Sequence, residues 1–289
     1  MEFYLAIITF TMISVIAVSG IYVLTGLTGM FSLGQAAFMA IGAYVSGVLV
    51  VKAGLPFGVA ALIAIIASVF VGFIVGLPTV RLRRDYISLV TLGFGEAITA
   101  LLNQTQSLTG GALGFSGIPR YTTVTVALIS AVVCILLVSY FKQSKYGRQC
   151  IALKSDELAA KAMGINVPRI KMIAFLFSVA VTSYSGVLYA FYTTYVDPGL
   201  FGWKRSAEWV IMVFFGGVNS LTGSIVGTII LTALPEALRF ASAYRTVFYA
   251  ILVLIIINFK PTGLFGEYEI TLNNIKKLFG KKGGKQDVA

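Results

Sequence analysis

The chain has 289 residues, of which 58% are hydrophobic and only 11% are charged, and its mean hydropathy is +0.91. Soluble domains carry about 25% charged residues, so this composition excludes an ordinary soluble globular protein. The net charge of +11 is concentrated in a few loops and at the C-terminal end, which is typical of the cytoplasmic side of a membrane protein rather than of a nucleic-acid-binding protein.

Two further features of the composition narrow the chemistry. The chain has no histidine, which removes imidazole catalysis and the commonest metal ligand. Cys134 lies in an apolar run and Cys150 in a basic loop, so we expect neither a disulfide nor a metal site. The long apolar runs do not alternate with polar residues as barrel strands do. They predict an all-α, polytopic transmembrane bundle of about 8–10 membrane segments.

The first expected span runs from Phe3 to Leu24, and the few residues before it carry no Lys or Arg, which argues against a signal peptide. The next apolar stretch, 26–47, contains five glycines. Such glycines either allow two helices to pack closely or break a helix inside the membrane. Ser32 and Gln35 lie near the expected break and are candidates for lining a substrate pathway.

The third expected span, 57–77, leads into a basic loop at 81–85, which the positive-inside rule places in the cytoplasm. The following segment, 86–102, contains Thr91 and Glu96. An ionisable group within a membrane segment is unfavourable and indicates a functional site or a buried partner. Alternatively, the segment is irregular and Glu96 reaches an interface or an aqueous cavity. Both residues join the candidate pathway set.

A Gly-, Ser- and Thr-rich segment at 103–121 is expected outside, and 123–141 returns the chain to the cytoplasm. The segment 142–171 that follows has seven Lys or Arg and two Asp or Glu, a net charge of +5. Membrane-length apolar runs flank it on both sides. We therefore predict that 142–171 is a cytoplasmic loop within a single permease domain, 1–266, which a basic cytoplasmic tail at 267–289 follows.

A short helix is predicted inside this loop. Ser155 is expected to cap its N-terminus, and Gly164 is expected to end it in the left-handed conformation. Its small apolar face suits docking into another protein, although an ordinary solvated loop fits the pattern equally well. The candidate docking residues are Ser155, Asp156, Glu157, Ala159, Ala160, Met163 and Gly164.

The rest of the chain shows a conflict between charge and the number of crossings. Three simple spans after the basic loop would leave the tail outside, whereas the tail's lysines indicate the cytoplasmic side. The segment 207–235 is too long for one span and is interrupted by glycines, so we predict a split or re-entrant helix there. Asn219, Ser220 and Thr222 in this segment complete the candidate pathway set.

A weak internal similarity links the two glycine-interrupted segments. The pentapeptides at 29–33 and 217–221 share three of five residues. Interrupted helices in corresponding positions of two halves are where transporters place substrate sites, near the middle of the membrane. This pattern predicts a possible internal pseudo-repeat.

Six separated blocks together resemble one family, the LivM-type permease subunits of bacterial branched-chain amino acid ABC transporters. The blocks are GLTGMFSLGQAAFMAIGAY (26–44), RLRRDYISLVTLGFGE (81–96), LTGGALGFSGIP (108–119), SKYGRQCIALKSDELAAKAMGINVPRIKMIAFLFS (144–178), VFFGGVNSLTGSIVG (213–227) and KPTGLFG (260–266). They span nearly the whole chain in the family's order. Two positions depart from the family pattern: Arg84 stands where RLRGDY has Gly, and Tyr146 varies the start of the basic loop.

The resemblance implies a permease subunit of a binding-protein-dependent ABC importer in the bacterial cytoplasmic membrane, with branched-chain amino acids as the substrate. Alternatives are urea, short amides or other amino acids and, in a different class, an ATP-independent channel or secondary carrier. The implied partners are a LivH-type sister permease, two cytoplasmic ATPase subunits, an extracytoplasmic solute-binding protein and membrane lipid, with no nucleic acid.

The resemblance also implies that the segment 155–165 is the coupling helix, which docks into an ATPase subunit. The chain itself has no Walker A pattern. We therefore expect no enzyme activity and no cofactor on this chain, with ATP and Mg²⁺ bound by the partner subunits.

Overall fold

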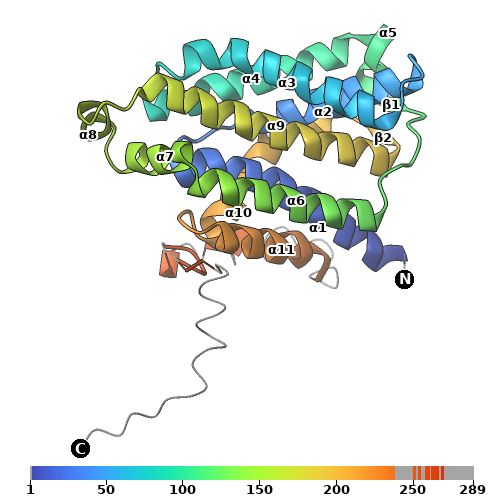
Figure 1. Cartoon of the computed structure of the whole chain (residues 1–289). Helices are drawn as coiled ribbons and strands as arrows, with labels where there is room; N and C mark the ends of the chain where they lie inside the picture. The colour runs from blue at the N-terminus through green and yellow to red at the C-terminus, as the bar shows by residue number, and fades with distance from the viewer. Residues whose placement is uncertain are drawn as a thin grey trace, which may run out of the picture.

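The computed structural model describes residues 2–237 and, beyond them, 250, 251, 253, 254, 258–260, 262–266, 268 and 269. Most of the predicted tail at 267–289, and of a short last span that the apolar run at 246–259 predicts, therefore lies outside the described residues. The long helices run side by side along one axis (Figure 1). The main helices are α1 (Glu2–Tyr22), α2 (Gln35–Val51), α3 (Phe57–Thr79), α4 (Arg84–Gln104), α6 (Val124–Gln143), α7 (Lys145–Ser155), α8 (Glu157–Ala162), α9 (Val167–Thr193), α10 (Trp203–Gly216) and α11 (Leu221–Ala237).

Short elements complete the described part of the chain. A π-helical turn extends α1, and a two-stranded antiparallel pairing with a few short turns closes one end of the bundle. These elements are η1 (Val23–Thr28), α5 (Gln106–Thr109), η2 (Gly111–Leu113), β1 (Phe115–Ser116), β2 (Tyr195–Val196) and η3 (Pro198–Phe201). In the strand pair, Phe115 lies opposite Val196 and Ser116 opposite Tyr195.

The prediction of an all-α, polytopic membrane bundle is confirmed. Five helices within the described residues are long and apolar enough to cross a membrane: α1 with η1, α3, α4, α6 and α9. The bent pair of α10 and α11 passes the same test only as a pair. With the two arms of this pair and the shorter α2 counted separately, the described residues hold eight membrane segments, at the lower end of the predicted range.

Helix α9 is the centre of the bundle and packs against α1, α2 and α3. Glycines allow the closest approach, between α9 and α2. A Cβ on Gly186 would overlap the carbonyl oxygen of Met39, and one on Gly42 would overlap the carbonyl oxygen of Ser183. Small residues at helix crossings are the usual basis of tight packing in lipid, where burial of apolar side chains supplies little driving force between helices.

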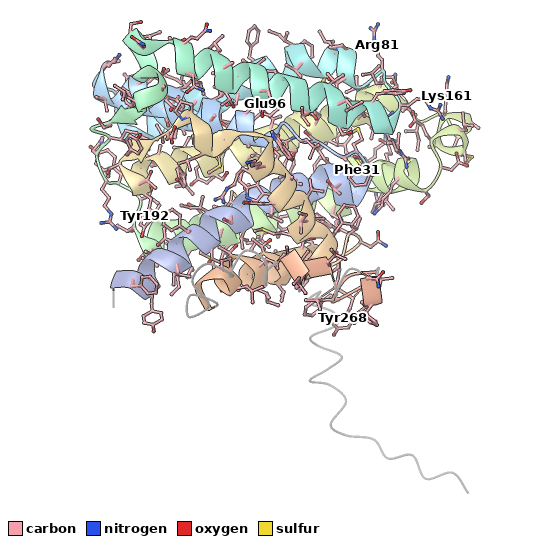
Figure 2. The ribbon with its side chains drawn as sticks, turned by 180° about the vertical axis from the view of Figure 1, so that it is seen from behind. Phe31, Arg81, Glu96, Lys161, Tyr192 and Tyr268 are labelled. Atoms are coloured by element: carbon pink, nitrogen blue, oxygen red, sulfur yellow. The ribbon has the colours of Figure 1, made fainter. Side chains whose placement is uncertain are left out.

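The two ends of the bundle have different chemistry. Arg81 and Lys161 lie at one end and Tyr192 at the other (Figure 2). Helices α7 and α8 also lie at the basic end, and β1 and β2 lie at the opposite end (Figure 1). By the positive-inside rule, the concentration of basic residues leads us to expect the α7–α8 end on the cytoplasmic side, and we call it the cytoplasmic end.

The predicted split between 207 and 235 is confirmed. Helices α10 and α11 are bent by 120° at a short break that begins at Gly217. Gly217 has φ +128°, a value that a residue with a Cβ rarely adopts. The chain therefore turns inside the bundle at the place where the conflict between crossings and charge led us to expect a break.

Candidate functional site

Helix α8 forms a short projection at the cytoplasmic end (Figure 1). Its N-cap is Asp156 rather than the predicted Ser155. The Asp156 carboxylate accepts hydrogen bonds from the backbone N–H groups of Leu158 and Ala159 at 2.8 and 3.0 Å. Ser155 is still helical, as the last residue of α7. Gly164 has φ +81°, which confirms the predicted left-handed end.

The two sides of α8 differ in exposure. Leu158 and Met163 are 80% and 83% exposed, whereas Ala160 is only 5% exposed. Asp156 and Ala159 are also exposed. The apolar contact surface that α8 offers to the cytoplasm is therefore carried by Leu158 and Met163, and Ala160 packs inward.

The base of α8 is fixed by ion pairs. Glu157 lies 2.9 Å from the ammonium of Lys171, which is 1% exposed in α9, and 4.0 Å from the guanidinium of Arg84 in α4. Arg84 also donates to the carbonyls of Lys154, at 3.0 Å, and of Leu153. Glu157 therefore joins α8 to two membrane helices, α4 and α9.

A groove of about 930 Å³ lies beside Glu157, between the α3–α4 loop and the segment from α8 to the start of α9. Its charged lining residues are Arg81, Arg83, Arg84, Glu157 and Lys161. Four of these five side chains are cationic, so the groove presents positive charge to the cytoplasm next to the exposed Leu158.

The first glycine-rich break runs from Gly29 to Gly34, between η1 and α2. Here three of the predicted pathway residues come together. The backbone N–H of Leu33 donates to the hydroxyl of Thr91 at 3.1 Å. Ser32 and Gln35 are buried, and their side-chain polar atoms have no hydrogen-bond partner within the described residues. Unpaired polar groups in a membrane interior are unfavourable. A ligand, a water molecule or a different conformation of this break would supply the missing hydrogen bonds.

The second break, between α10 and α11, holds Asn219 and Ser220. Ser220 accepts from the N–H of Gly223 at 3.0 Å, which caps α11, and donates to the carbonyl of Tyr268 at 2.6 Å. Asn219 Oδ1 accepts from Lys154 Nζ at 2.6 Å. These side chains thus hold together the cytoplasmic end in this conformation. Thr222 is half-buried in the first turn of α11.

The two breaks face each other. Lys154, besides its bond to Asn219, donates to the carbonyl of Gly26 at 2.8 Å. The rings of Phe31 and Phe214 stack with their centroids 5.5 Å apart. The two similar pentapeptides therefore coincide with both helix breaks, each of which begins at a glycine with positive φ.

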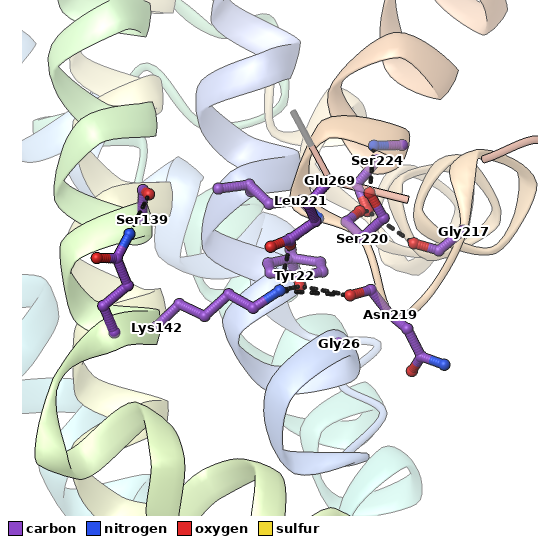
Figure 3. Close-up of polar contacts among 12 residues, drawn as sticks. Tyr22, Gly26, Ser139, Lys142, Gly217, Asn219, Ser220, Leu221, Ser224 and Glu269 are labelled. Atoms are coloured by element: carbon purple, nitrogen blue, oxygen red, sulfur yellow. Dashed lines mark hydrogen bonds and ion pairs between the residues drawn. The ribbon is translucent and has the colours of Figure 1, made fainter. Parts of the chain in front are cut away.

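Lys142 is a residue that the sequence reasoning did not single out. Its ammonium donates to the hydroxyl of Tyr22 at 3.0 Å and pairs with the carboxylate of Glu269 (Figure 3). The Tyr22 hydroxyl lies 3.2 Å from the carbonyl of Asn219. The sequence does show that Lys142 is a basic residue in the last turn of an apolar helix. It does not show the partners of Lys142, because Tyr22 and Glu269 are distant in sequence.

Glu96 lies away from both breaks. It is exposed, midway along α4, and its Oε1 accepts from the backbone N–H of Trp203 at 3.3 Å. The seven predicted pathway residues thus occupy three places: the first break, the second break, and the contact of α4 with the start of α10. Their role in lining a pathway stays a prediction.

The family model for the permease component of the branched-chain amino acid transport system matches residues 3–257 of this chain. The high-affinity branched-chain amino acid transport system permease proteins LivM of Salmonella typhimurium and Escherichia coli are each 31% identical, over 97% of this chain and 73% of theirs. The permease protein LivH of Salmonella typhimurium is 25% identical, over 65% of this chain and 61% of its own.

Proposed function

The chain belongs to the family of branched-chain amino acid transport system permease components, and on this premise we propose that it carries branched-chain amino acids inward as one permease subunit of an ABC importer. A LivH-type sister permease, two cytoplasmic ATPase subunits and an extracytoplasmic solute-binding protein complete the transporter. ATP and Mg²⁺ bind to the ATPase subunits, and this chain needs no cofactor of its own.

The observation that carries this proposal is the exposed tip of α8 on an anchored base. Leu158 and Met163 expose most of their apolar surface to water, although apolar side chains of this size are usually buried. A groove in an ATPase subunit that covers them would remove this unfavourable exposure. The neighbouring cationic groove supplies charge for an acidic rim of the same partner.

The contacts at the base of α8 supply a path for force. Displacement of α8 pulls on Glu157, and Glu157 is paired with Lys171 in α9 and lies near Arg84 in α4. Helix α9 packs against α1, α2 and α3, so a tilt of α9 moves most of the bundle. Lys154 connects the preceding helix, α7, to η1, which leads into the first break, and to Asn219 in the second break. Closure of the ATPase dimer would act through these contacts to alternate the access of the pathway.

Helix α4 provides the face for the sister permease. It is both the least apolar and the least buried of the five helices that can span a membrane alone. Its open side carries Glu96, and a Cβ on Gly93 would meet no atom within 4 Å. A charged group is unfavourable against lipid, and a glycine allows close approach of another helix. We therefore place the subunit seam along α4.

Reconstitution of the whole transporter tests the function. This chain, its sister permease and the ATPase subunits are placed in proteoliposomes with the solute-binding protein, and uptake of radiolabelled leucine is measured. We expect leucine to accumulate only with ATP. Equal leucine uptake with and without ATP would indicate that the protein is an ATP-independent channel or a secondary carrier. ATP-driven uptake of urea or a short amide without uptake of leucine would contradict the assigned substrate.

A further inference from the structure

A second groove, of about 390 Å³, lies between the middle of α4 and the start of α10. Its volume falls within the range of ~300–1,000 Å³ that small-ligand pockets occupy. Four of its lining residues are charged: Glu96, Lys204, Arg205 and Glu208. Glu96 lies between the cytoplasmic end and the opposite end of the bundle (Figure 2). Charged side chains at this depth of a membrane protein face a cavity or another protein chain and mark substrate pathways.

Two of the four charges neutralise each other. Arg205 lies 3.3 Å from Glu208, and its guanidinium also stacks over the ring of Trp209 at 5.7 Å. Glu96 and Lys204 have no ion-pair partner within the described part of the chain. One oxygen of Glu96 accepts from the N–H of Trp203, which leaves the other available. The groove therefore offers one carboxylate and one ammonium without a counter-ion.

From this arrangement we propose that the groove binds the charged end of a free amino acid, with Glu96 holding the α-ammonium and Lys204 the α-carboxylate. The inference rests on the proposed function and assigns a specific site to it. Leu200 and Trp203 line the groove with apolar surface for the substrate's side chain.

The pair of opposite, unneutralised charges selects one class of solute. An amino acid zwitterion satisfies both Glu96 and Lys204. An anion or a cation satisfies only one of them and leaves the other charge without a partner at membrane depth, which is unfavourable. Urea and simple amides are neutral and satisfy neither. The groove thus favours amino acids over the amide substrates that similar permeases are expected to carry.

The groove is open on the same exposed side of α4 that we assign to the subunit seam. Glu96 and Lys204 are both exposed in the isolated chain, and Trp203 is 43% exposed. The sister permease would close the groove in the assembled transporter and exclude lipid from it. The site is therefore expected to bind the amino acid at the seam between the two permease subunits.

The variants Glu96→Gln and Lys204→Gln test the proposal in the complete transporter. Each removes a charge with little change in shape, and Gln at 96 still accepts from the Trp203 N–H. With saturating leucine-loaded binding protein, we expect each variant to lower leucine uptake about tenfold or more, while copurification of the subunits is unchanged. Thr99→Val is the matched control, because Thr99 lines the same groove but its hydroxyl is bonded to the Gly95 carbonyl at 3.0 Å.

A binding measurement without the binding protein separates ligand contact from a structural role. The wild-type transporter in nanodiscs should bind leucine more tightly than 4-methylpentanoate, which lacks the ammonium, and leucinamide, which lacks the carboxylate. Glu96→Gln should abolish the preference over 4-methylpentanoate, and Lys204→Gln the preference over leucinamide. Wild-type uptake and unchanged preferences in both variants would overturn the assignment of the groove alone. Absence of leucine uptake by the wild-type transporter would overturn the proposed function, and this inference with it.

Discussion

Arg84, at the start of α4, donates a hydrogen bond from Nη1 to the carbonyl oxygen of Lys154 at 3.0 Å, and so joins a membrane helix to the end of α7. The same guanidinium donates to the Leu153 carbonyl and lies 4.0 Å from Glu157. The last carbonyls of a helix lack partners within the helix, and a cation there is favourable. Arg84 therefore holds together α4, α7 and α8, at a position where the family pattern has a glycine.

Replacement of this arginine should loosen the connection. We expect Arg84→Ala to lower the free energy of unfolding by about 1–3 kcal/mol, because hydrogen bonds from a charged donor are lost, and to reduce transport-coupled ATP hydrolysis. Thermal unfolding in detergent and ATPase assays of the reconstituted transporter measure the two effects. Arg81→Ala is the matched control for the effect on stability, since Arg81 lies exposed in the same loop. Equal losses of thermal stability in the two variants would contradict the role given to Arg84.

The tip of α8 gives a second prediction. Leu158→Asp and Met163→Asp should leave the chain folded, because both side chains are largely exposed, yet they should prevent copurification of the ATPase subunits. Ala160→Asp should instead reduce the amount of folded chain in the membrane, because it places a charge at a position that is 5% exposed. Normal ATPase binding by both tip variants would show that α8 docks elsewhere or not at all.

Some features of this site were accessible from the sequence because they follow from composition and charge. The break near Gly217 was predicted because the basic tail and basic loop require the same side of the membrane. The left-handed end of α8 was predicted because Gly164 has no Cβ and adopts a positive φ without strain. Both inferences use chemistry that is local or that a membrane imposes on the whole chain.

Other features depend on contacts that no local pattern reveals. The ion pair of Lys142 and Glu269 joins residues that are 127 positions apart. The cap of α8 was misplaced by one residue because Ser155 and Asp156 both suit an N-cap. Helix α8 has only six residues, too few for a periodic pattern, so the inward position of Ala160 could not be predicted.

The packing of α9 on α2 predicts a strong difference between two glycines. Gly186→Ala should destabilise the chain by about 1–3 kcal/mol, because its methyl group would overlap the Met39 carbonyl and push the helices apart. Gly58→Ala should be neutral or stabilising by up to ~1 kcal/mol, because no atom lies within 4 Å of the new methyl and alanine favours a helix. Thermal unfolding of both variants in detergent measures the difference, and similar stabilities would contradict the close packing.

Cys150 provides a chemical test of the packing of α7. The thiol is fully buried, and burial raises its pKa from 9.0 to about 12. At pH 8 the thiol is therefore held in its protonated form, whereas the thiolate is the reactive form. In a Cys134→Ser background, maleimide should therefore modify the folded chain far more slowly than the chain unfolded in SDS. Rapid modification of the folded chain would show that α7 does not pack as described.

The cytoplasmic contact of Lys142 with Glu269 gives the last prediction. Lys142, near the end of α6, also donates to Tyr22 near the end of α1, so the ion pair ties two helix ends to the segment that follows the last described helix. The two side chains are 19% and 28% exposed, and burial reduces screening of such a pair by water and salt.

Lys142→Glu and Glu269→Lys should each destabilise the chain, and the double variant should recover part of the loss. A double-mutant cycle of thermal unfolding should give a coupling free energy of about 0.5–2 kcal/mol. Gln143→Ala is the neighbouring control, because the hydrogen bond of the Gln143 side chain within the described residues is to Ser139 of its own helix. Additive effects of the two charge reversals would show that the pair does not hold the cytoplasmic end together.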